Sequence, residues 1–140
     1  MTIPDDMKAH NRRLIEEFRA NGGVEEGRPL LLLTTTGRRT GQARTTPMMF
    51  IPDGDRRLVI ASNAGAPRDP DWFRNLVEHP DVTVEVTGDT YRATAVVPTG
   101  AERDRLFADV VSKYPFFADH QAKAGRTIPV VILERADQQG

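Results

Sequence analysis

One turn of the chain gathers the residue types that bind phosphate. The run from Thr36 to Arg44 places two glycines and three arginines in one short segment. Glycine lets the backbone turn tightly and present N–H groups to an anion, and each charge-assisted hydrogen bond contributes roughly 1.5–3 kcal/mol. The spacing predicts a phosphate site, with a solvated basic hairpin as the alternative. It is not a Walker A loop, because no Lys-Ser or Lys-Thr pair and no helix follow the second glycine. The candidate residues are Arg38, Arg39, Thr40, Gly41 and Arg44.

Other catalytic patterns are scarce in this sequence. The three histidines, His10, His79 and His120, are far apart and have no cysteine beside them, so we expect no metal site. No Gly-x-Ser-x-Gly elbow supports a serine hydrolase. A second polar, glycine-assisted corner at 62–65 would be an ordinary loop if taken alone. This scarcity favours a protein whose cofactor carries the chemistry while the chain binds and orients it.

The composition indicates one globular domain. The 140 residues include 28% charged and 39% hydrophobic residues, and the net charge of −1 argues against a general nucleic-acid binder. Sixteen of the 19 cations are arginine, the side chain best suited to bidentate binding of phosphate and carboxylate. Cysteine is absent, no signal-peptide pattern is visible, and no apolar run approaches the ~20 residues of a membrane span. We therefore expect a cytoplasmic protein.

The hydrophobic pattern predicts an N-terminal helix, followed by strands with further helices between them. Residues 5–20 predict an amphipathic helix that Asn21-Gly22-Gly23 ends. It is expected to pack on the core; the alternatives are a helix that covers a cleft or one that rests on a membrane surface. Strands are expected at 30–36, 44–51, 56–62, 82–87, 90–97 and 128–134, with helices at 71–78 and 99–113 and a short helix or loop up to Gly125.

Several local features refine this pattern. Short turns between the strands predict a mainly antiparallel sheet, a meander over 30–62, and an α+β class centred on a barrel or curled sheet. Pro47 indicates an edge, a bulge or a bend, because proline cannot donate to a strand ladder. The run Thr99–Glu102 matches a capping box, and His79 is expected to end its helix. Val77 is expected to be an apolar contact of the 71–78 helix.

Five segments occur in an order and spacing that are specific when taken together. They are Leu32–Pro47, Ala61–Gly65, Pro70–Leu76, Tyr114–Phe117 and Arg126–Val130. Together they resemble the deazaflavin-dependent nitroreductase family of actinobacteria, over about residues 28–135. The resemblance divides the chain into an N-terminal helix and linker at 1–27, a cofactor-binding domain at 28–135, and a flexible tail at 136–140.

The resemblance implies a fold, a cofactor and a set of site residues. The fold is a split β-barrel of the flavin-reductase and pyridoxamine-oxidase kind, with about six strands and three or four peripheral helices. The cofactor is coenzyme F420, a deazaflavin that donates hydride. Its phosphate and polyglutamate tail would meet Arg38, Arg39 and Arg44, with Thr40 and Gly41 in the same turn. The ring and its ribityl chain would contact Thr46, Pro47, Met48, Met49, Ser62, Asn63, Ala64 and Gly65, buttressed by Trp72 and Asn75. Met49, Tyr114, Phe117 and His120 would line the substrate side, where Tyr114, Ser62 or His120 would act on the acceptor.

The chain departs from the nitroimidazole-activating member of that family at four positions. That member has a lysine where Asn63 stands and tyrosines where Met49, Phe117 and His120 stand. Those tyrosines help to shape its substrate pocket, so the departures argue against nitroimidazole reduction while leaving cofactor binding intact. For the run Tyr114–Phe117, plain core packing is the alternative to a substrate wall.

The expected activity is hydride transfer from reduced F420 to a small acceptor such as a quinone, an enone or a nitroaromatic. We expect a monomer or homodimer, with peripheral membrane contact through the N-terminal helix left open. One alternative is a non-catalytic carrier or sequestering protein for the same cofactor, and another is an FMN-dependent oxidoreductase on the same barrel. A nucleic-acid-binding barrel is disfavoured by the net charge and by an aromatic content of only 6%.

Overall fold

A computed structural model describes residues 3–20 and 30–136. The expected helix stop at Asn21–Gly23, the rest of the linker up to residue 29 and the tail from residue 137 lie outside the described residues. In the described part the helices are α1 (Ile3–Ala20), α2 (Asp71–Glu78), α3 (Gly100–Lys113) and α4 (Phe116–Ala124), with a 3-10 turn η1 (Asn63–Gly65). The strands are β1 (Leu30–Thr36), β2 (Ala43–Met49), β3 (Ile51–Asp53), β4 (Arg56–Ile60), β5 (Asp81–Val86), β6 (Asp89–Val96) and β7 (Val130–Arg135).

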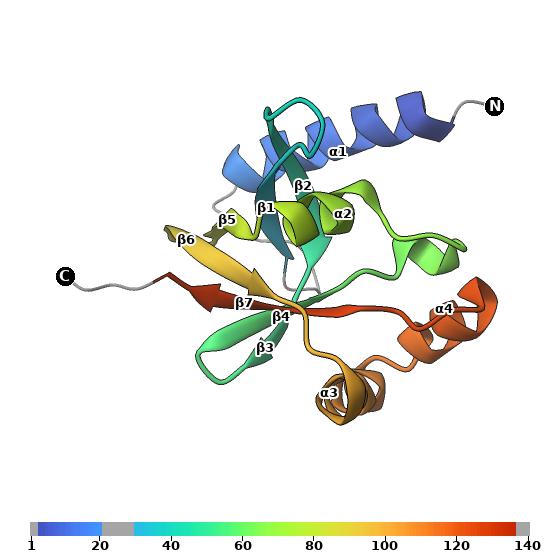
Figure 1. The fold of residues 1–140 in the computed structure, drawn as a ribbon. Helices are drawn as coiled ribbons and strands as arrows, with labels where there is room; N and C mark the ends of the chain where they lie inside the picture. The colour runs from blue at the N-terminus through green and yellow to red at the C-terminus, as the bar shows by residue number, and fades with distance from the viewer. Residues whose placement is uncertain (1–2, 21–29, 137–140) are drawn as a thin grey trace.

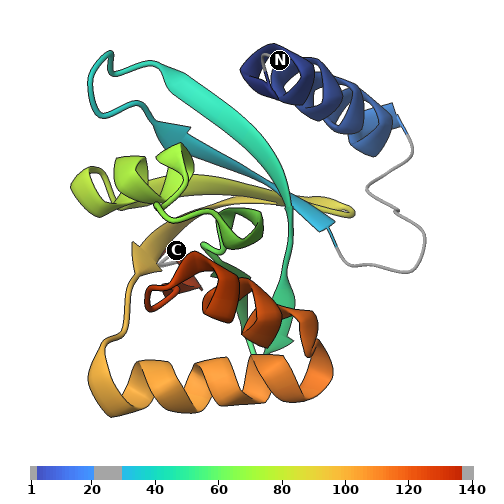
Figure 2. The same ribbon diagram turned by 90° about the vertical axis from the view of Figure 1, so that its right-hand side faces the viewer.

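The seven described strands form one antiparallel sheet in the order β2-β1-β5-β6-β7-β4-β3. Since β2 and β3 follow each other in the chain but lie at opposite ends of this order, the chain crosses from one edge to the other at Phe50. The sheet curls accordingly (Figures 1 and 2). The expected meander over 30–62 is therefore wrong, because β2 does not pair with β4. The expected strand 44–51 is two strands, which explains the one strand more than predicted.

Local sequence accounts for the β1–β2 and β5–β6 hairpins of this sheet. Leu31, Leu32 and Leu33 are fully buried in β1, and β1 pairs with β2 through a register that sets Leu32 against Pro47. Because β2 is an edge strand, Pro47 has no ladder partner to lose on its outer side, and the edge is the one of its three predicted placements that the sheet order confirms. The predicted β5–β6 hairpin is confirmed, with Val86 opposite Asp89.

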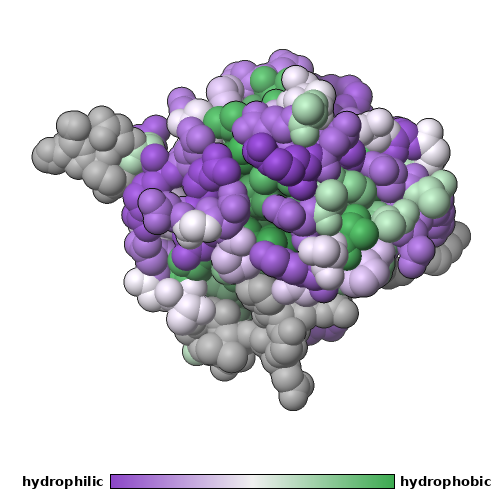
Figure 3. Space-filling model, turned by 90° about the horizontal axis from the view of Figure 1, so that it is seen from below, coloured by the Kyte–Doolittle hydropathy of each residue, from purple (hydrophilic) through white to green (hydrophobic). Residues whose placement is uncertain are grey.

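Two clusters of buried apolar residues fill the interior. The first joins strands from both halves of the sheet to α2, through Phe73 and Leu76. The second packs β3, β4 and β7 against α3 and α4, through Leu106, Phe107, Val110 and Phe117. The face seen in Figure 3 is mostly polar, with hydrophobic side chains in narrow patches between polar ones. Val77 of α2 is 56% exposed, so the expectation that it packs as an apolar contact is wrong.

The helices divide between two ends of the sheet. α1 and α2 lie beside the β1–β2 hairpin, whereas α3 and α4 lie at the opposite end (Figures 1 and 2). His79 ends α2 as predicted, and its amide donates to the carbonyl of Asn75 at 2.8 Å. Thr99 stands at the N-cap of α3 with extended backbone but makes no side-chain capping hydrogen bond, so the predicted capping box does not form. None of the described helices is long and apolar enough to cross a membrane.

Candidate functional site

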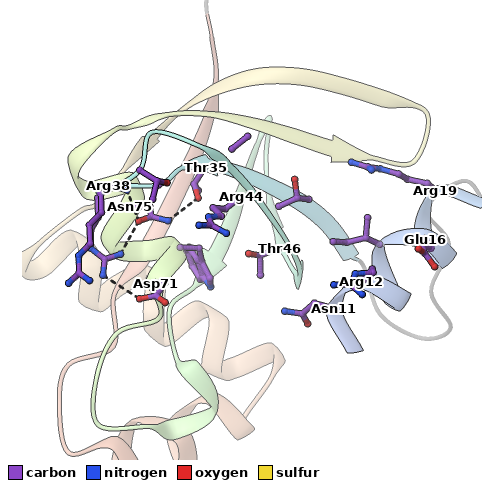
Figure 4. Close-up of a pocket in the computed structure, with 17 residues that line it drawn as sticks. Asn11, Arg12, Glu16, Arg19, Thr35, Arg38, Arg44, Thr46, Asp71 and Asn75 are labelled. Carbon is purple, nitrogen blue, oxygen red and sulfur yellow. Dashed lines mark hydrogen bonds and ion pairs between the residues drawn. The ribbon is translucent and has the colours of Figure 1, made fainter. Parts of the chain in front are cut away.

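A cleft of about 880 Å³ lies between α1, the β1–β2 hairpin and α2. Its volume is within the range of roughly 300–1,000 Å³ typical of small-molecule sites. In the view of Figure 4, Arg44 and Thr46 lie between the cluster around Arg38 and the α1 residues. From the hairpin, the cleft is lined by Thr35, Gly37, Arg38, Arg39, Thr40, Ala43, Arg44, Thr45 and Thr46; from α2 by Asp71, Trp72 and Asn75; and from α1 by Asn11, Arg12, Ile15, Glu16 and Arg19.

The arginine turn is closed by its own hydrogen bonds. The amide of Gly37 donates to the carbonyl of Gln42, and the amide of Gly41 to the carbonyl of Gly37, both at 2.8 Å. The amide of Gln42 donates to the Thr40 hydroxyl at 3.2 Å. A Cβ on Gly37 would lie 2.8 Å from that hydroxyl oxygen, which accounts for glycine at this position. The expectation that glycine amides present themselves to an anion is thus wrong for Gly37 and Gly41, because both amides are already donated within the turn.

Arg38 is held in place by α2. The Oδ1 atom of Asn75 accepts from the backbone amide of Arg38 at 3.1 Å and from its Nη1 at 2.9 Å. Asn75 is only 5% exposed, and its Nδ2 donates to the hydroxyl of Thr35 at 3.5 Å. The carboxylate of Asp71 lies 3.4 Å from Nη2 of Arg38. Asn75 therefore positions the arginine turn, rather than merely buttressing a cofactor wall as expected.

Arg39 and Arg44 are the accessible cations of this turn. Both are exposed and line the cleft, and neither side chain has a hydrogen bond or ion pair with another residue in 3–20 or 30–136. The lining contains five arginines but only two carboxylates, Glu16 and Asp71. The cleft is thus strongly positive in a chain whose net charge is −1. Guanidinium groups bind phosphate and carboxylate bidentately, so the chemistry suits a dianionic or polyanionic ligand.

Helix α1 forms the wall that the sequence did not identify as part of the site. Phe18 is buried, and Arg19 binds Glu85 of β5 through two hydrogen bonds, at 3.2 and 2.8 Å. The hydrogen bond that Arg19 donates to the Glu85 carboxylate raises the pKa of Arg19 above its usual value. Two of the alternatives for this helix thus hold together, because one face packs on the body while another covers a cleft. Long-range contacts show both roles, and the helical pattern alone carries no such information.

A second group of predicted site residues lies along the loop after β4. Its organiser is Arg126, whose guanidinium donates to the carbonyls of Ala66 at 3.2 Å and Arg68 at 3.0 Å. Arg126 also forms a 2.6 Å ion pair with Asp69. Ser62 is 8% exposed, and its hydroxyl does not cap η1. In the sequence, Arg126 was identified only as part of a motif, and nothing there predicted that it binds the loop after β4 at several points.

Helix α4 brings the predicted substrate residues beside this loop. A Cβ on Gly65 would lie 3.4 Å from the carbonyl oxygen of His120 and 2.9 Å from Cδ of Lys123. The ring of His120 lies 5.5 Å from that of Phe116 and 5.9 Å from that of Phe117. Its Nδ1 atom is buried and has no hydrogen-bond partner among the residues the structure describes. The second buried cluster, which packs against α3 and α4, contains Phe117 and contacts Met49 and Tyr114. Core packing therefore accounts for part of this group of residues.

The structure therefore separates the predicted residues into two groups. Of those predicted, seven line the cleft: Arg38, Arg39, Thr40, Arg44, Thr46, Trp72 and Asn75. Ten others do not line it: Gly41, Pro47, Met48, Met49, Ser62, Asn63, Gly65, Tyr114, Phe117 and His120. The side chain of Ala64 lies outside what the structure describes. The β2 strand connects the groups, because it runs from Arg44 in the cleft to Met49 at the second core cluster.

Comparison with known proteins agrees with the cofactor chemistry that this geometry suits. A model of the F420H(2)-dependent quinone reductase family matches residues 7–135. An F420H(2)-dependent quinone reductase of Mycobacterium tuberculosis is 40% identical over 110 residues, which cover 76% of this chain and 74% of that protein.

Two solved structures share the fold. One is described as an F420-H2 dependent reductase; it is 35% identical, has a TM-score of 0.69, and the match covers 80% of this chain and 100% of the other. The second is described as a domain-swapped dimer; it is 31% identical, has a TM-score of 0.72, and the match covers 88% of this chain and 96% of the other. The predicted α+β class with a split β-barrel is confirmed.

Proposed function

This chain belongs to the F420H(2)-dependent quinone reductase family and uses F420 as its cofactor, and we propose that it transfers a hydride from reduced F420 to a quinone. The observation that carries the proposal is the positive cleft beside β2, in a chain that matches this family over residues 7–135. Reductase activity with F420 is common to the family; the quinone as acceptor is the proposed part.

The residues of the cleft fit an anionic cofactor. When bound, reduced F420 supplies the hydride. We place its phosphate between Arg39 and Arg44, because these two side chains are exposed and unpaired within the described residues, while Arg38 is already shared with Asn75 and Asp71. The ring is placed along β2 toward Met49, against the wall made by Ser62–Gly65.

The proposed acceptor site is the region where η1, α4 and the end of β2 meet. Met49, Tyr114 and Phe117 contribute an apolar wall that excludes water, as a quinone ring requires. The hydroxyl of Ser62 or Tyr114 is proposed to donate a hydrogen bond to the carbonyl oxygen of the acceptor as negative charge develops there. His120 is proposed as the alternative to these hydroxyls, as the group that gives a proton to the acceptor.

A single assay tests the reaction. Reduced F420 is mixed with the protein and with menadione, an enone or a nitroaromatic, and loss of reduced cofactor is followed by absorbance. The proposal predicts turnover that is fastest with menadione. Binding of F420 without turnover of any acceptor would favour the carrier alternative, and activity with FMN in place of F420 would favour the flavin alternative.

The oligomeric state belongs to the same proposal. We propose that the chain works as a monomer or a homodimer, and the similarity to a structure described as a domain-swapped dimer supports the second form. Light scattering coupled to size-exclusion chromatography measures the mass directly and separates the two.

A further inference from the structure

We propose that Arg103 of α3 and Gln121 of α4 are positioning residues for the acceptor, because they fix α4, which carries Phe117 and His120, against the loop after β4. The inference rests on the proposed acceptor site, where η1, α4 and the end of β2 meet. Helix α4 lies between α3 on one side and η1 on the other (Figures 1 and 2). A contact that joins α3 to α4 therefore decides how closely α4 approaches η1.

Arg103 is a buried cation that joins three segments. It is 8% exposed, and its guanidinium carbon lies 4.3 Å from the centre of the Phe107 ring. Its Nε and Nη2 atoms donate to the carbonyl of Ile128 at 3.1 and 2.6 Å, and Nη2 also donates to Oε1 of Gln121 at 2.6 Å. Its Nη1 atom donates to the carboxylate of Asp104 at 3.0 Å. One planar group thus connects α3, α4 and the chain before β7, which the compact ammonium of a lysine could not do.

Gln121 completes a closed set of hydrogen bonds. Its Oε1 atom accepts from the backbone amide of Ile128 at 3.0 Å as well as from Arg103. Ile128 is fully buried, and both of its backbone groups are bonded, the amide to Gln121 and the carbonyl to Arg103. The backbone carbonyl of Gln121 accepts from the amide of Gly125 at 3.1 Å, where α4 ends. The end of α4 is therefore held through one side chain.

Stability alone does not account for an arginine at this position. Burial removes water from the guanidinium, and the carboxylate paired with it belongs to a side chain, Asp104, that is 71% exposed and screened by solvent. Replacement of a buried ion by an apolar side chain of similar volume is often neutral or stabilising. An apolar side chain cannot fix the carbonyl of Ile128 and the amide oxygen of Gln121 at one distance and angle. The function of Arg103 is therefore geometric.

The other side of α4 forms part of the proposed acceptor site. A Cβ on Gly65 of η1 would lie 3.4 Å from the carbonyl oxygen of His120, so the backbone of α4 packs directly on this glycine. Arg126, two residues before Ile128, forms the ion pair with Asp69 that holds the loop after β4. A shift at Ile128 would therefore reach both walls of the site, the one on α4 and the one on the loop.

The test uses two variants that break this contact and two that keep it. Gln121→Leu removes the shared acceptor, and Arg103→Lys keeps the charge but loses the planar fork. Gln121→Glu is the conservative variant, because it keeps an acceptor oxygen for both donors. Arg105→Lys makes the same arginine-to-lysine change at an exposed position on α3 and is the matched control. Circular dichroism and the melting temperature establish the temperature at which every variant is folded.

Steady-state kinetics with reduced F420 measures kcat and KM for menadione and for a nitroaromatic. For Gln121→Leu and Arg103→Lys, kcat/KM for menadione should fall roughly 10- to 100-fold, the range for a remote change that shifts a site by about 1 Å. The KM values and the ratio between the two acceptors should change, while the affinity for F420 stays close to that of wild type. Gln121→Glu should retain most of the activity and Arg105→Lys all of it. Loss of folded protein would instead lower kcat for both acceptors by one factor and leave each KM unchanged.

A second measurement needs neither cofactor nor acceptor. The amide of Gly65 donates to the carbonyl of Ser62 at 2.9 Å, and this glycine packs against α4, so its amide NMR resonance reports the approach of α4 to η1. In the free protein this resonance should move in Gln121→Leu and in Arg103→Lys. It should keep its wild-type position in Arg105→Lys.

Two results would overturn the inference, and they are distinguishable. If folded Gln121→Leu and Arg103→Lys keep the wild-type KM, the wild-type ratio between acceptors and the wild-type Gly65 resonance, the positioning role does not exist while the reductase activity stands. If wild-type protein reduces no acceptor with F420, the proposed function fails, and the inference fails with it because no acceptor site remains to be positioned.

Discussion

The side-chain oxygen of Asn75 accepts two hydrogen bonds from Arg38, one from its backbone amide at 3.1 Å and one from its guanidinium at 2.9 Å. Through this pair, α2 fixes the turn between β1 and β2 from outside the hairpin. The Asn75 side chain, which is 5% exposed, also donates a hydrogen bond to the hydroxyl of Thr35. The turn is therefore held by tertiary contacts as well as by its own sequence.

Asn75→Ala is expected to weaken both stability and cofactor binding. Removing a buried acceptor leaves donors of Arg38 without partners, which costs about 1–3 kcal/mol of unfolding free energy. The affinity for F420 should fall because Arg38 and the turn lose their fixed position. Chemical denaturation and fluorescence titration measure the two effects. Glu78→Ala, on an exposed part of the same helix, is the control; equal losses in the two variants would contradict the positioning role.

Alanine variants of the three arginines of the turn are expected to differ in their effects on F420 binding and on melting temperature. Arg39→Ala and Arg44→Ala should weaken F420 binding with almost no change in melting temperature, because both side chains are exposed and unpaired among the described residues. Arg38→Ala should lower both quantities, since it also breaks the contacts to Asn75 and Asp71. Each lost charge-assisted contact should cost about 1.5–3 kcal/mol of binding free energy, less where solvent screens it.

Differential scanning fluorimetry measures the melting temperature of these variants, and titration measures their affinity for F420. A loss of melting temperature for Arg39→Ala or Arg44→Ala as large as that for Arg38→Ala would mean that all three arginines are structural. In that case the cleft would lose its proposed anion ligands.

Gly37→Ala is expected to destabilise the turn through a specific clash. The added Cβ would lie 2.8 Å from the hydroxyl oxygen of Thr40 and 3.3 Å from the carbonyl oxygen of Gln42. Overpacking of this kind costs about 1–3 kcal/mol. Thr40→Ala removes the nearer atom, so the double variant should be more stable than the sum of the single effects. Strict additivity in a denaturation cycle would contradict this account of Gly37.

Arg126→Lys is expected to loosen the loop that carries Ser62 and Gly65. A lysine ammonium keeps the charge but cannot reproduce the planar fork that reaches Asp69 and the carbonyls of Ala66 and Arg68. We expect a loss of about 1–3 kcal/mol in stability and a higher KM for the acceptor. Steady-state kinetics checks the second effect, with Asp69→Asn as the milder companion. An unchanged KM would place this loop outside the acceptor site.

The elements of the fold could be predicted because their signals are local. Alternating apolar residues identified β5 and β6, and the run of leucines identified β1. The bend at Phe50 could not be predicted, because the apolar run on either side of it continues without a break in the sequence. The meander was wrong for the same reason: it followed from order along the chain, whereas pairing depends on the crossing between edges.

The site was predictable in its residue types and less so in their partners. The arginines, Trp72 and Asn75 do meet in one cleft, as the motif indicated. Whether the amides of Gly37 and Gly41 are free depends on turn closure, which residue types do not reveal. The α1 wall of the cleft and the contacts between Arg126 and the loop after β4 join segments that are distant in sequence. Only the tertiary structure therefore identifies them.

The central claim is that the cleft between α1 and the arginine turn binds F420 through Arg39 and Arg44. The direct measurement is an equilibrium titration of wild-type protein and the Arg39→Ala/Arg44→Ala double variant with F420, FMN and a single-stranded oligonucleotide. The account predicts that wild-type protein binds F420 at micromolar concentration or below and binds FMN and the oligonucleotide more weakly, and that the folded double variant loses most of its F420 affinity. Failure of the wild type to bind F420 at micromolar concentration, or undiminished binding by the double variant, would contradict it.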